Sequence, residues 1–292
     1  MGGVAAGRWR KALRAARWGL VALAVGLAVD AVLVAPYRIE VTRHRVPAAV
    51  ESPVRVAAIT DLHTRGLGRR ERRLVALLER ERPDLVVLVG DVLADTGALT
   101  GTADAAGAAA EVLPRLHAPL GVWAVPGNWE HWRHEVDEQA LFGAAGVRLL
   151  VNRAEPVRKD LWLVGLDDWM SGAPLPEQAL SGLPEGVFAI GLFHSPAGFD
   201  AVAGRLPLGL AGHTHGGQVR LPFLGPFWLP RGSAGRANGW YEKRGSRLYV
   251  SRGVGMTILP VRLFCRPELP IFDLVPGGGI FPDRAQSSPE WE

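Results

Sequence analysis

Five short apolar runs constrain the fold of this chain most strongly, because each is followed by a residue that can bind a metal ion. The runs cover 54–60, 85–89, 122–125, 187–193 and 208–211. Each has the length of a β-strand and is mostly apolar, which is typical of strands buried on both faces. Between the first two, the stretch 69–82 places Leu74, Leu77 and Leu78 on one face of a helix. The pattern predicts strand–helix–strand units and hence an α/β fold.

Polar side chains able to bind metal ions follow the carboxyl end of every run. They are Asp61, His63, Asp91, Asn128, His194, His213 and His215. Ligands of open α/β sheets bind at that edge, because the loops there converge on one crevice. Carboxylate, amide and imidazole groups suit divalent cations, and seven of them could hold two ions that share a carboxylate. We therefore expect a centre for two divalent metal ions.

The segment from Gly212 to Gly217 carries the strongest single signal. Its two histidines, two positions apart among three glycines, have no evident packing role. By contrast, Gly-Asp and Gly-Asn are common in ordinary turns, and a single buried histidine is more often a core residue. The order of all five segments is what favours a metal centre. Cys265 is the only cysteine of the sequence, which excludes an internal disulfide and a cysteine-rich zinc cluster.

The positive charge of the chain is confined to its beginning. The net charge is +4, but five cations precede the first acidic residue and leave −1 for the remainder. These cations are Arg8, Arg10, Lys11, Arg14 and Arg17. A nearly neutral body lacks the excess positive charge that nucleic-acid binding requires, so we expect no nucleic-acid partner.

The stretch 18–37 is predicted to be a transmembrane anchor that follows the basic segment 1–17. Asp30 is its only charge, and about 20 helical residues at roughly 1.5 Å each span a hydrocarbon core of about 30 Å. Trp18 and Tyr37 stand where interfacial aromatic residues are enriched. The alternatives are a cleaved signal peptide and a buried core helix. The preceding cations favour a cytoplasmic N-terminus, which places the rest of the chain outside the cytoplasm.

One domain is expected to follow the anchor, over residues 38–275. The stretch 38–46 alternates like an exposed strand. The tail 276–292 is rich in glycine, proline, serine and charge, and it is predicted to be disordered. We expect the chain to act as a monomer.

Two stretches resemble the calcineurin-like metallophosphoesterase superfamily, and within it the membrane-associated bacterial branch. They are AGHTHGGQVRLP at 211–222 and LYVSRGVGMTILPVRLFCRPEL at 248–269, and the similarity covers roughly 38–275. The resemblance implies a four-layer α/β/β/α sandwich and a metal-dependent hydrolase of phosphate esters or anhydrides. It assigns Asp61, His63 and His215 to one ion, and Asn128, His194 and His213 to the other, with Asp91 bridging. It also implies Mn²⁺, Fe or Zn²⁺ as the metals.

Trp129 departs from the pattern of that family, in which a histidine commonly follows the asparagine and assists the leaving group. Indole cannot donate a proton at catalytic pH. Three explanations stay open: a leaving group of low pKa, proton donation by His131, or weak or lost catalysis. We expect Asp91, Asn128 and His131 to act in catalysis. Trp129, Gly216 and Gly217 are expected to contact the substrate.

The segment 221–230 bears on the substrate, because it is apolar yet too rich in proline for a central strand. It either folds onto its own core or admits acyl chains and the bilayer surface. Relatives in the resembling branch include enzymes that cleave UDP-2,3-diacylglucosamine, which is the leading specific candidate, although its cytoplasmic location conflicts with the predicted topology. The alternative function is a catalytically weak, metal-stabilised membrane protein that binds a phosphorylated ligand.

Two lesser features also have open interpretations. The arginines at 65, 69, 70, 72 and 73 either meet anionic headgroups or form a solvated helix face. Asp167 and Asp168 either position water or substrate, or cap a following turn.

Overall fold

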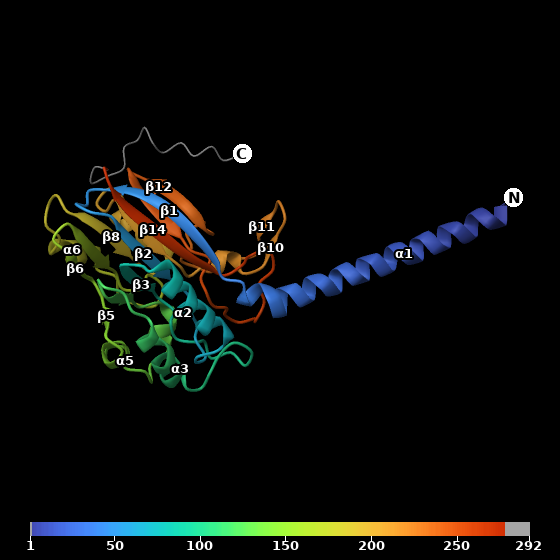
Figure 1. The fold of residues 1–292 in the computed structure, drawn as a ribbon, viewed down its shortest axis with the longest axis horizontal. Coiled ribbons are helices and arrows are strands. Elements are labelled where there is room, and N and C mark those ends of the chain that lie inside the picture. The colour runs from blue at the N-terminus through green and yellow to red at the C-terminus, as the bar shows by residue number, and fades with distance from the viewer. Residues whose placement is uncertain (1, 278–292) are drawn as a thin grey trace.

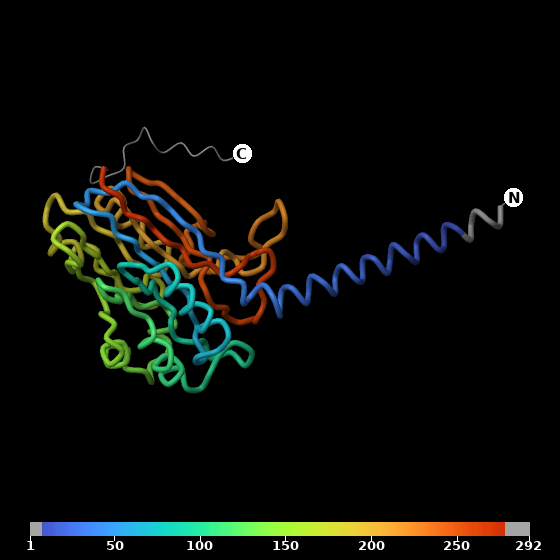
Figure 2. The backbone as a smooth tube through the Cα atoms, in the orientation of Figure 1, coloured from blue at the N-terminus to red at the C-terminus, as the bar shows by residue number. Residues whose placement is uncertain are grey.

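A long helix leaves the body of the protein in the computed structural model, which describes residues 2–277 (Figure 1). Helix α1 (Gly2–Val29) continues through a π-helical turn, η1 (Asp30–Val34), into a 3₁₀ turn, η2 (Ala35–Tyr37). The basic segment 1–17 is therefore helical from Gly2 and continuous with the predicted anchor. Figure 2 shows this helix as one extended coil that ends at the body.

The helix α1 is exposed along its apolar length. Trp18 is 70% exposed and Leu20 is 68% exposed, whereas Ala31 and Ala35 are buried where the chain joins the body. Within the described residues, Arg8–Tyr37 forms one helical segment long and apolar enough to cross a membrane. The alternative of a buried core helix is wrong, because the apolar side chains project away from the core.

Two six-stranded sheets form the centre of the body. The first has the order β1 (Glu40–Ala48), β14 (Glu268–Pro276), β2 (Val54–Ile59), β3 (Leu85–Val89), β4 (Val122–Val125), β5 (Val147–Leu149). The second has the order β12 (Gly239–Lys243), β13 (Ser246–Val250), β9 (Leu208–Ala211), β8 (Phe188–Leu192), β7 (Leu161–Gly165), β6 (Arg153–Arg158). Strands β2 to β5 are mutually parallel, as are β7, β8, β9 and β13. Their carboxyl ends therefore open on the same edge within each sheet.

Helices cover the outer face of each sheet. The first sheet carries α2 (Arg69–Glu81), α3 (Ala105–Val112) and α5 (Glu138–Ala144). The second carries α6 (Pro176–Ser181) and α7 (Phe199–Val202). Alternate residues of β2 separate the cores: Ala57 and Ile59 pack toward α2, while Val56 and Ala58 pack between the sheets. The three cores confirm the predicted four-layer α/β/β/α sandwich.

The expected elements agree with the structure to within one or two residues. Helix α2 ends where Arg82 adopts a left-handed conformation (φ 48°) before Pro83, which cannot continue a helix. Strand β1, expected to be exposed, is partly exposed at the edge of the sheet and pairs in parallel with β14. Strand β14 extends through Pro276, one residue beyond the predicted domain boundary. The rest of the predicted tail, 278–292, lies outside the described residues.

Two further elements complete the fold near the site. A small hairpin, β10 (Arg220–Leu221) and β11 (Gly225–Pro226), follows the histidine pair. The short helix α4 (Asn128–Trp132) follows β4 directly.

Candidate metal centre

The residues expected to bind metal are all buried at one edge of the two sheets, with exposed fractions from 0 to 8%. Five of them have a positive φ, which non-glycine residues adopt only a few per cent of the time. They are Asp61, His63, Asp91, His213 and His215. Such backbone strain persists where surrounding structure enforces it, most often at functional sites. The fold therefore holds these side chains in position at some energetic cost.

The first cluster contains Asp61, His63 and His215, whose ligand atoms all lie within 4.8 Å of one another. The Nε2 atoms of His63 and His215 face each other at 3.1 Å, and His215 Nε2 lies 3.5 Å from Asp61 Oδ1. Asp61 Oδ1 also accepts the backbone N–H of His213 at 2.7 Å. These contacts bring β2 and β9 together at one point.

The second cluster contains Asp91, His194 and His213, again within 4.8 Å. His194 Nε2 lies 3.1 Å from Asp91 Oδ2 and 3.2 Å from His213 Nδ1. Asn128 is also buried and lines the same cavity as Asp91 and His213. Asp91, His194 and His213 thus form a group distinct from the first cluster, with Asn128 lining the same cavity.

Asp91 lies between the two clusters. Its Oδ2 is 3.1 Å from His194 Nε2 in one cluster and 3.7 Å from His63 Nε2 in the other. Its Oδ1 accepts the backbone N–H of Trp129 at 2.8 Å, which fixes the carboxylate. This is the placement that a bridging ligand requires.

Backbone carbonyls orient three of the four imidazoles. The Nδ1 atoms of His63 and His194 lie 3.1 and 3.0 Å from the carbonyls of Leu93 and Val89. His213 instead directs Nε2 to the carbonyl of Arg231, at 2.6 Å. A carbonyl can only accept, so each of these nitrogens carries the proton and the other ring nitrogen is left free to bind metal.

The side chains fit a pair of cations by three criteria. First, two donors bound at about 2.1 Å to one ion lie about 3 to 3.5 Å apart, which matches the facing imidazoles. Second, the buried atoms Asp61 Oδ2 and Asn128 Oδ1 have no hydrogen-bond partner. Buried oxygens without partners are costly, and cation binding would remove that cost.

The third criterion is electrostatic. Burial alone would lower the pKa of His194, but attraction to the Asp91 carboxylate outweighs it and raises that pKa well above its ordinary value. Burial acts to raise the pKa of Asp91, but its interaction with His194 outweighs this effect and lowers the pKa to about 2. The Asp91 carboxylate therefore attracts positive charge at His194, whereas burial lowers the pKa of His63, His213 and His215 and favours the neutral imidazoles that metal binding requires.

Comparison with known proteins assigns this geometry to a family. Residues 54–217, which carry all seven side chains, match the calcineurin-like phosphoesterase family. An uncharacterised metallophosphoesterase, YkuE, of Bacillus subtilis (strain 168) is 30% identical, over 82% of this chain and 86% of the relative. The chain belongs to the calcineurin-like phosphoesterase family. It is accordingly a metal-dependent phosphoester hydrolase.

Two other relatives are similar to this metallophosphoesterase over more than two thirds of its length. The phosphodiesterase YaeI of Escherichia coli (strain K12) is 30% identical, over 69% of this chain and 74% of the relative. A protein of Danio rerio described as a transmembrane protein with metallophosphoesterase domain is 28% identical, over 79% of this chain and 55% of that protein.

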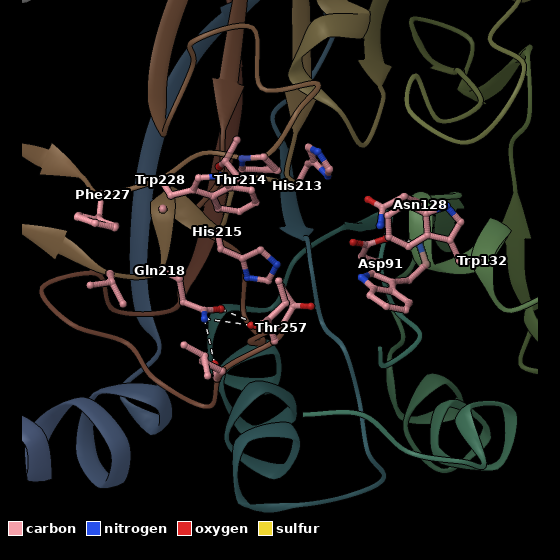
Figure 3. Close-up of a pocket in the computed structure, with 16 residues that line it drawn as sticks. Asp91, Asn128, Trp132, His213, Thr214, His215, Gln218, Phe227, Trp228 and Thr257 are labelled. Carbon is pink, nitrogen blue, oxygen red and sulfur yellow. Dashed lines mark hydrogen bonds between the residues drawn. The ribbon is translucent and has the colours of Figure 1, made fainter. Parts of the chain in front are cut away.

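A cavity of about 340 Å³ opens beside the metal centre (Figure 3). Asp91 and Asn128 lie on one side of it, and His213 and His215 lie opposite. Its remaining walls are mainly apolar: Trp129, Trp132, Val219, Phe227, Trp228, Pro230, Ile258 and Leu259. A phosphate group at the metal centre would therefore have an apolar neighbourhood for the rest of its molecule.

Of the residues expected to contact the substrate or to donate a proton, some line the cavity and others do not. Trp129 and Gly217 line the cavity, whereas Gly216 packs against Arg252 and Cys265. His131 points Nε2 at Asp167 Oδ1, 2.5 Å away. The hydrogen bond to Asp167 raises the pKa of His131.

The two aspartates after β7 cap a turn, which is one of the two interpretations that the sequence left open. Asp168 Oδ2 accepts the backbone N–H groups of Met170 and Ser171 at 3.0 and 2.8 Å. Asp167 Oδ2 accepts that of Ala173 at 2.8 Å. Asp167 thus combines turn formation with the hydrogen bond to His131.

Glu130 is a site residue that the sequence reasoning missed. Its Oε2 accepts the backbone N–H groups of Asp91 and Gly127 at 2.8 and 2.7 Å, and Oε1 accepts that of Leu93 at 2.9 Å. Burial, followed by repulsion from Asp91, raises the pKa of Glu130 to about 7. Glu130 stands at the third helical position, where a capping glutamate is common, but the N-cap is Gly127 rather than a Ser, Thr, Asp or Asn, so the sequence lacks the full capping signal.

Arg262 is a second missed residue, and no local pattern predicted it. It is fully buried and donates to the carbonyls of His215 (2.9 Å) and Arg252 (2.8 Å). Its Nη2 also lies 3.5 Å from His215 Nδ1. Arg262 therefore holds the loop that carries His215 in place through hydrogen bonds to its backbone.

Removal of bound metal is expected to lower Tm. Metal at about 100 times its Kd stabilises a folded protein by about 2.7 kcal/mol. For a domain of this size that corresponds to a shift of about 5–10 °C. Differential scanning fluorimetry of the full chain in detergent, with excess chelator and then with Mn²⁺ restored, would measure it. An unchanged Tm on chelation, with metal loss verified by mass spectrometry, would contradict a structural contribution of the ions.

Proposed function

We propose that this metallophosphoesterase hydrolyses a phosphodiester or pyrophosphate bond in a small-molecule substrate that carries an apolar or acyl group. The observation that carries the proposal is the cavity, which joins the two ligand clusters to walls of tryptophan, phenylalanine and aliphatic side chains. Charged metabolites without an apolar part would leave those walls unused. UDP-2,3-diacylglucosamine combines both features and is the leading specific candidate on chemical grounds. Because this nucleotide is cytoplasmic, it requires the domain to face the cytoplasm, and the outward topology proposed below would require another amphiphile of the same kind.

The seven candidate ligands would bind the two ions in the following way. Asp61, His63 and His215 would hold one divalent ion; Asn128, His194 and His213 would hold the other; and Asp91 would bridge them. When bound, the ions supply an acidified water and neutralise charge on the phosphoryl oxygens. Mn²⁺, Fe and Zn²⁺ all suit these donors.

The protein contributes orientation and exclusion of water around the reacting phosphate. The backbone N–H of Trp129 holds Asp91, while its indole and that of Trp132 line the cavity near Asn128. The rings lie 5.0 Å apart in an edge arrangement, which gives a rigid apolar wall. Asn128 and Asp91 are the residues we expect to act directly at the phosphate.

Trp129 implies a preference for good leaving groups. We expect pyrophosphate-type substrates to be cleaved better than alkyl phosphomonoesters, because nothing at position 129 can protonate a departing alkoxide. Trp129→His is expected to raise kcat/KM on an alkyl phosphomonoester by about 10²-fold, the lower end of general acid catalysis, with little change on a pyrophosphate. Steady-state kinetics on both substrates would measure the difference.

Trp132→His serves as the matched control, since it changes a neighbouring cavity tryptophan without restoring the family's histidine position. A wild-type chain that prefers alkyl monoesters would contradict the leaving-group argument. If His131→Ala instead removed activity on alkyl esters selectively, the proton would come from His131.

A substrate panel on the metal-loaded full chain in detergent tests the proposal as a whole. The panel comprises UDP-2,3-diacylglucosamine, nucleotide diphosphates, glycerophosphodiesters and alkyl monoesters. Preference for the acylated nucleotide supports the proposal, and preference for small polar esters opposes it.

The alternative is a metal-stabilised membrane protein that binds a phosphorylated ligand with little turnover, which Trp129 favours. Both functions require metal, so turnover separates them. No hydrolysis of any panel member, with both ions demonstrated by mass spectrometry, would support the binding function.

We also propose a location for the enzyme. The segment 18–37 would cross the cell membrane once with a cytoplasmic N-terminus, which places residues 38–275 outside the cytoplasm. Cleavage by a protease added outside intact cells would test the topology.

A further inference from the structure

The body contacts the chain at Ala31, and the apolar part of the helix between Trp18 and Ala31 is too short to span a membrane. The backbone N–H of Arg262 donates to the carbonyl of Ala31 at 2.9 Å, so the body contacts the helix at that level. From Trp18 to Ala31 the helix rises about 20 Å at 1.5 Å per residue. A hydrocarbon core is about 30 Å thick, so a membrane span must include residues beyond Ala31. Whatever packs beside Ala31 would then lie within the membrane boundary.

The segments beside Ala31 expose large apolar side chains. The loop 257–264 contacts η1, the turn that follows α1, because Arg262 N donates to the Ala31 carbonyl. It also contacts the β10–β11 hairpin, because Arg220 N donates to the Leu263 carbonyl at 2.9 Å. Seven side chains of the loop, the hairpin and the two residues after the hairpin are at least half exposed: Phe223, Leu224, Phe227, Trp228, Ile258, Leu259 and Phe264. Figure 1 shows the hairpin beside the base of α1. We call these seven residues the apolar tips.

Three of the apolar tips are held in a strained backbone conformation. Phe223, Ile258 and Phe264 have φ values of 66°, 65° and 50°. For a bulky or β-branched residue a positive φ is a genuine outlier, with a cost of roughly 1–3 kcal/mol. Their exposed side chains gain little packing within the body to offset that cost.

Polar contacts at the base of the loop hold it in place. Asp95 Oδ2 accepts from Thr257 Oγ1 at 2.9 Å and from the backbone N–H of Ile258 at 3.0 Å. Gln218 Nε2 donates to the carbonyls of Thr257 and Leu259 at 3.1 and 3.0 Å (Figure 3). The apolar side chains are therefore presented by a fixed scaffold, away from the core.

Exposed arginines lie beside the end of the membrane helix. The guanidinium of Arg69 stacks over the ring of Tyr37, 4.8 Å from its centroid, which places the start of α2 next to η2. Arg65, Arg72 and Arg73 are exposed nearby in the same segment, whereas Arg70 is buried and donates to the Leu62 and His63 carbonyls. Arginine side chains at this level suit anionic headgroups.

We propose that the body is partly immersed in the bilayer, with the apolar tips in the lipid layer beside α1 and the exposed arginines at headgroup level. Insertion of the tips would supply the apolar thickness that the helix lacks before Ala31, and it would bury side chains that are otherwise in water. The occupant of this surface is a lipid bilayer. The proposal rests on the segment 18–37 as a membrane span.

If the proposed function holds, immersion would also let the substrate enter the cavity directly from the bilayer. Phe227, Trp228, Ile258 and Leu259 belong both to the apolar tips and to the cavity wall. A continuous apolar surface thus runs from the bilayer side to the metal centre. A membrane amphiphile could keep its acyl chains in lipid while its phosphate reached Asp91.

The test measures membrane depth independently of hydrolysis. Cys265 is buried, so a cysteine introduced at Phe223 can be labelled selectively with an environment-sensitive fluorophore in the full chain. Phe223 and Leu224 lie outside the cavity wall, and Leu224→Cys is the second variant should Phe223→Cys fold poorly. The matched control is Leu175→Cys, an apolar residue 49% exposed at the start of α6, far from α1 in Figure 1.

In vesicles of phosphatidylcholine and phosphatidylglycerol, the label at Phe223 is expected to show a blue-shifted emission. Spin-labelled lipids should quench it and aqueous iodide should not, while the label at Leu175 should behave in the opposite way. Equal iodide quenching at the two positions would overturn the proposal. Because the readout is fluorescence, this failure is distinguishable from failure of the proposed function, which the substrate panel tests.

Discussion

Asp91→Ala is expected to lower kcat/KM for phosphodiester hydrolysis by about a thousandfold or more, equivalent to about 4 kcal/mol of transition-state stabilisation. The physical reason is position: Oδ2 of Asp91 lies 3.1 Å from His194 Nε2 and 3.7 Å from His63 Nε2. One substitution therefore removes a ligand from both proposed ions. Hydrolysis of a chromogenic phosphodiester with Mn²⁺, together with the metal content by mass spectrometry, would measure the effect.

Asp168→Asn is the matched control for that experiment. Asp168 is also buried at the same edge, but its oxygens accept hydrogen bonds from Ser195 and from the turn 170–171. The asparagine oxygen can retain part of these contacts, so the variant should keep both ions and most of its activity. If Asp91→Ala kept wild-type activity with normal metal content, the proposed bridging role would be wrong.

Gly127→Ala is expected to destabilise the protein by about 1–3 kcal/mol and to lower kcat by about a hundredfold. The backbone at Gly127 (φ −110°, ψ −171°) is accessible to alanine, so the effect is steric. A Cβ at this position would lie 2.4 Å from Asp91 Oδ1 and 2.5 Å from the Asp91 backbone nitrogen. Relief of that clash must move the loop that carries the bridging carboxylate. Chemical denaturation and steady-state kinetics would measure the two effects.

Gly143→Ala provides the control for the added methyl group. A Cβ at Gly143 would meet nothing within 4 Å, and the residue lies in helix α5. Alanine there should be neutral or stabilising by up to about 1 kcal/mol, because it reduces the conformational freedom of the unfolded chain. Equal behaviour of the two variants would show that close packing at Gly127 does not position Asp91.

The candidate metal ligands could be recognised in the sequence because each group of them directly follows an apolar run. A parallel strand delivers the residue after it to one edge of its own sheet, so Asp61, Asp91 and Asn128 share one edge and His194 and His213 share another. The meeting of these two edges depends on the packing of the sheets. The left-handed backbone at Asp61 and His213 could not be predicted in this way, since it is imposed by contacts between loops that are distant in sequence. The local sequence did not reveal Glu130 or Arg262, because Glu130 bonds Asp91 and Leu93 and Arg262 bonds His215, partners on loops that only the fold brings together.

For the apolar segment after the histidine pair, too, the sequence predicted the composition but not the position of the side chains. Composition identified 221–230 as apolar and unsuited to a central strand. That its side chains turn outward, beside the end of α1 and along the cavity wall, depends on hydrogen bonds between the hairpin, the loop 257–264 and the helix. Local sequence cannot distinguish a loop folded onto its own core from one that projects.

The sequence by itself determined the layered α/β architecture, the apolar N-terminal helix and the identity of the seven candidate ligands, because period, length and strand order are local properties of the chain. Tertiary structure decided the position of Asp91 between the two clusters, the direction in which His131 points and the surface that continues from the cavity to α1. These features are set by distances between segments far apart in sequence, and such distances exist only after the sheets have packed.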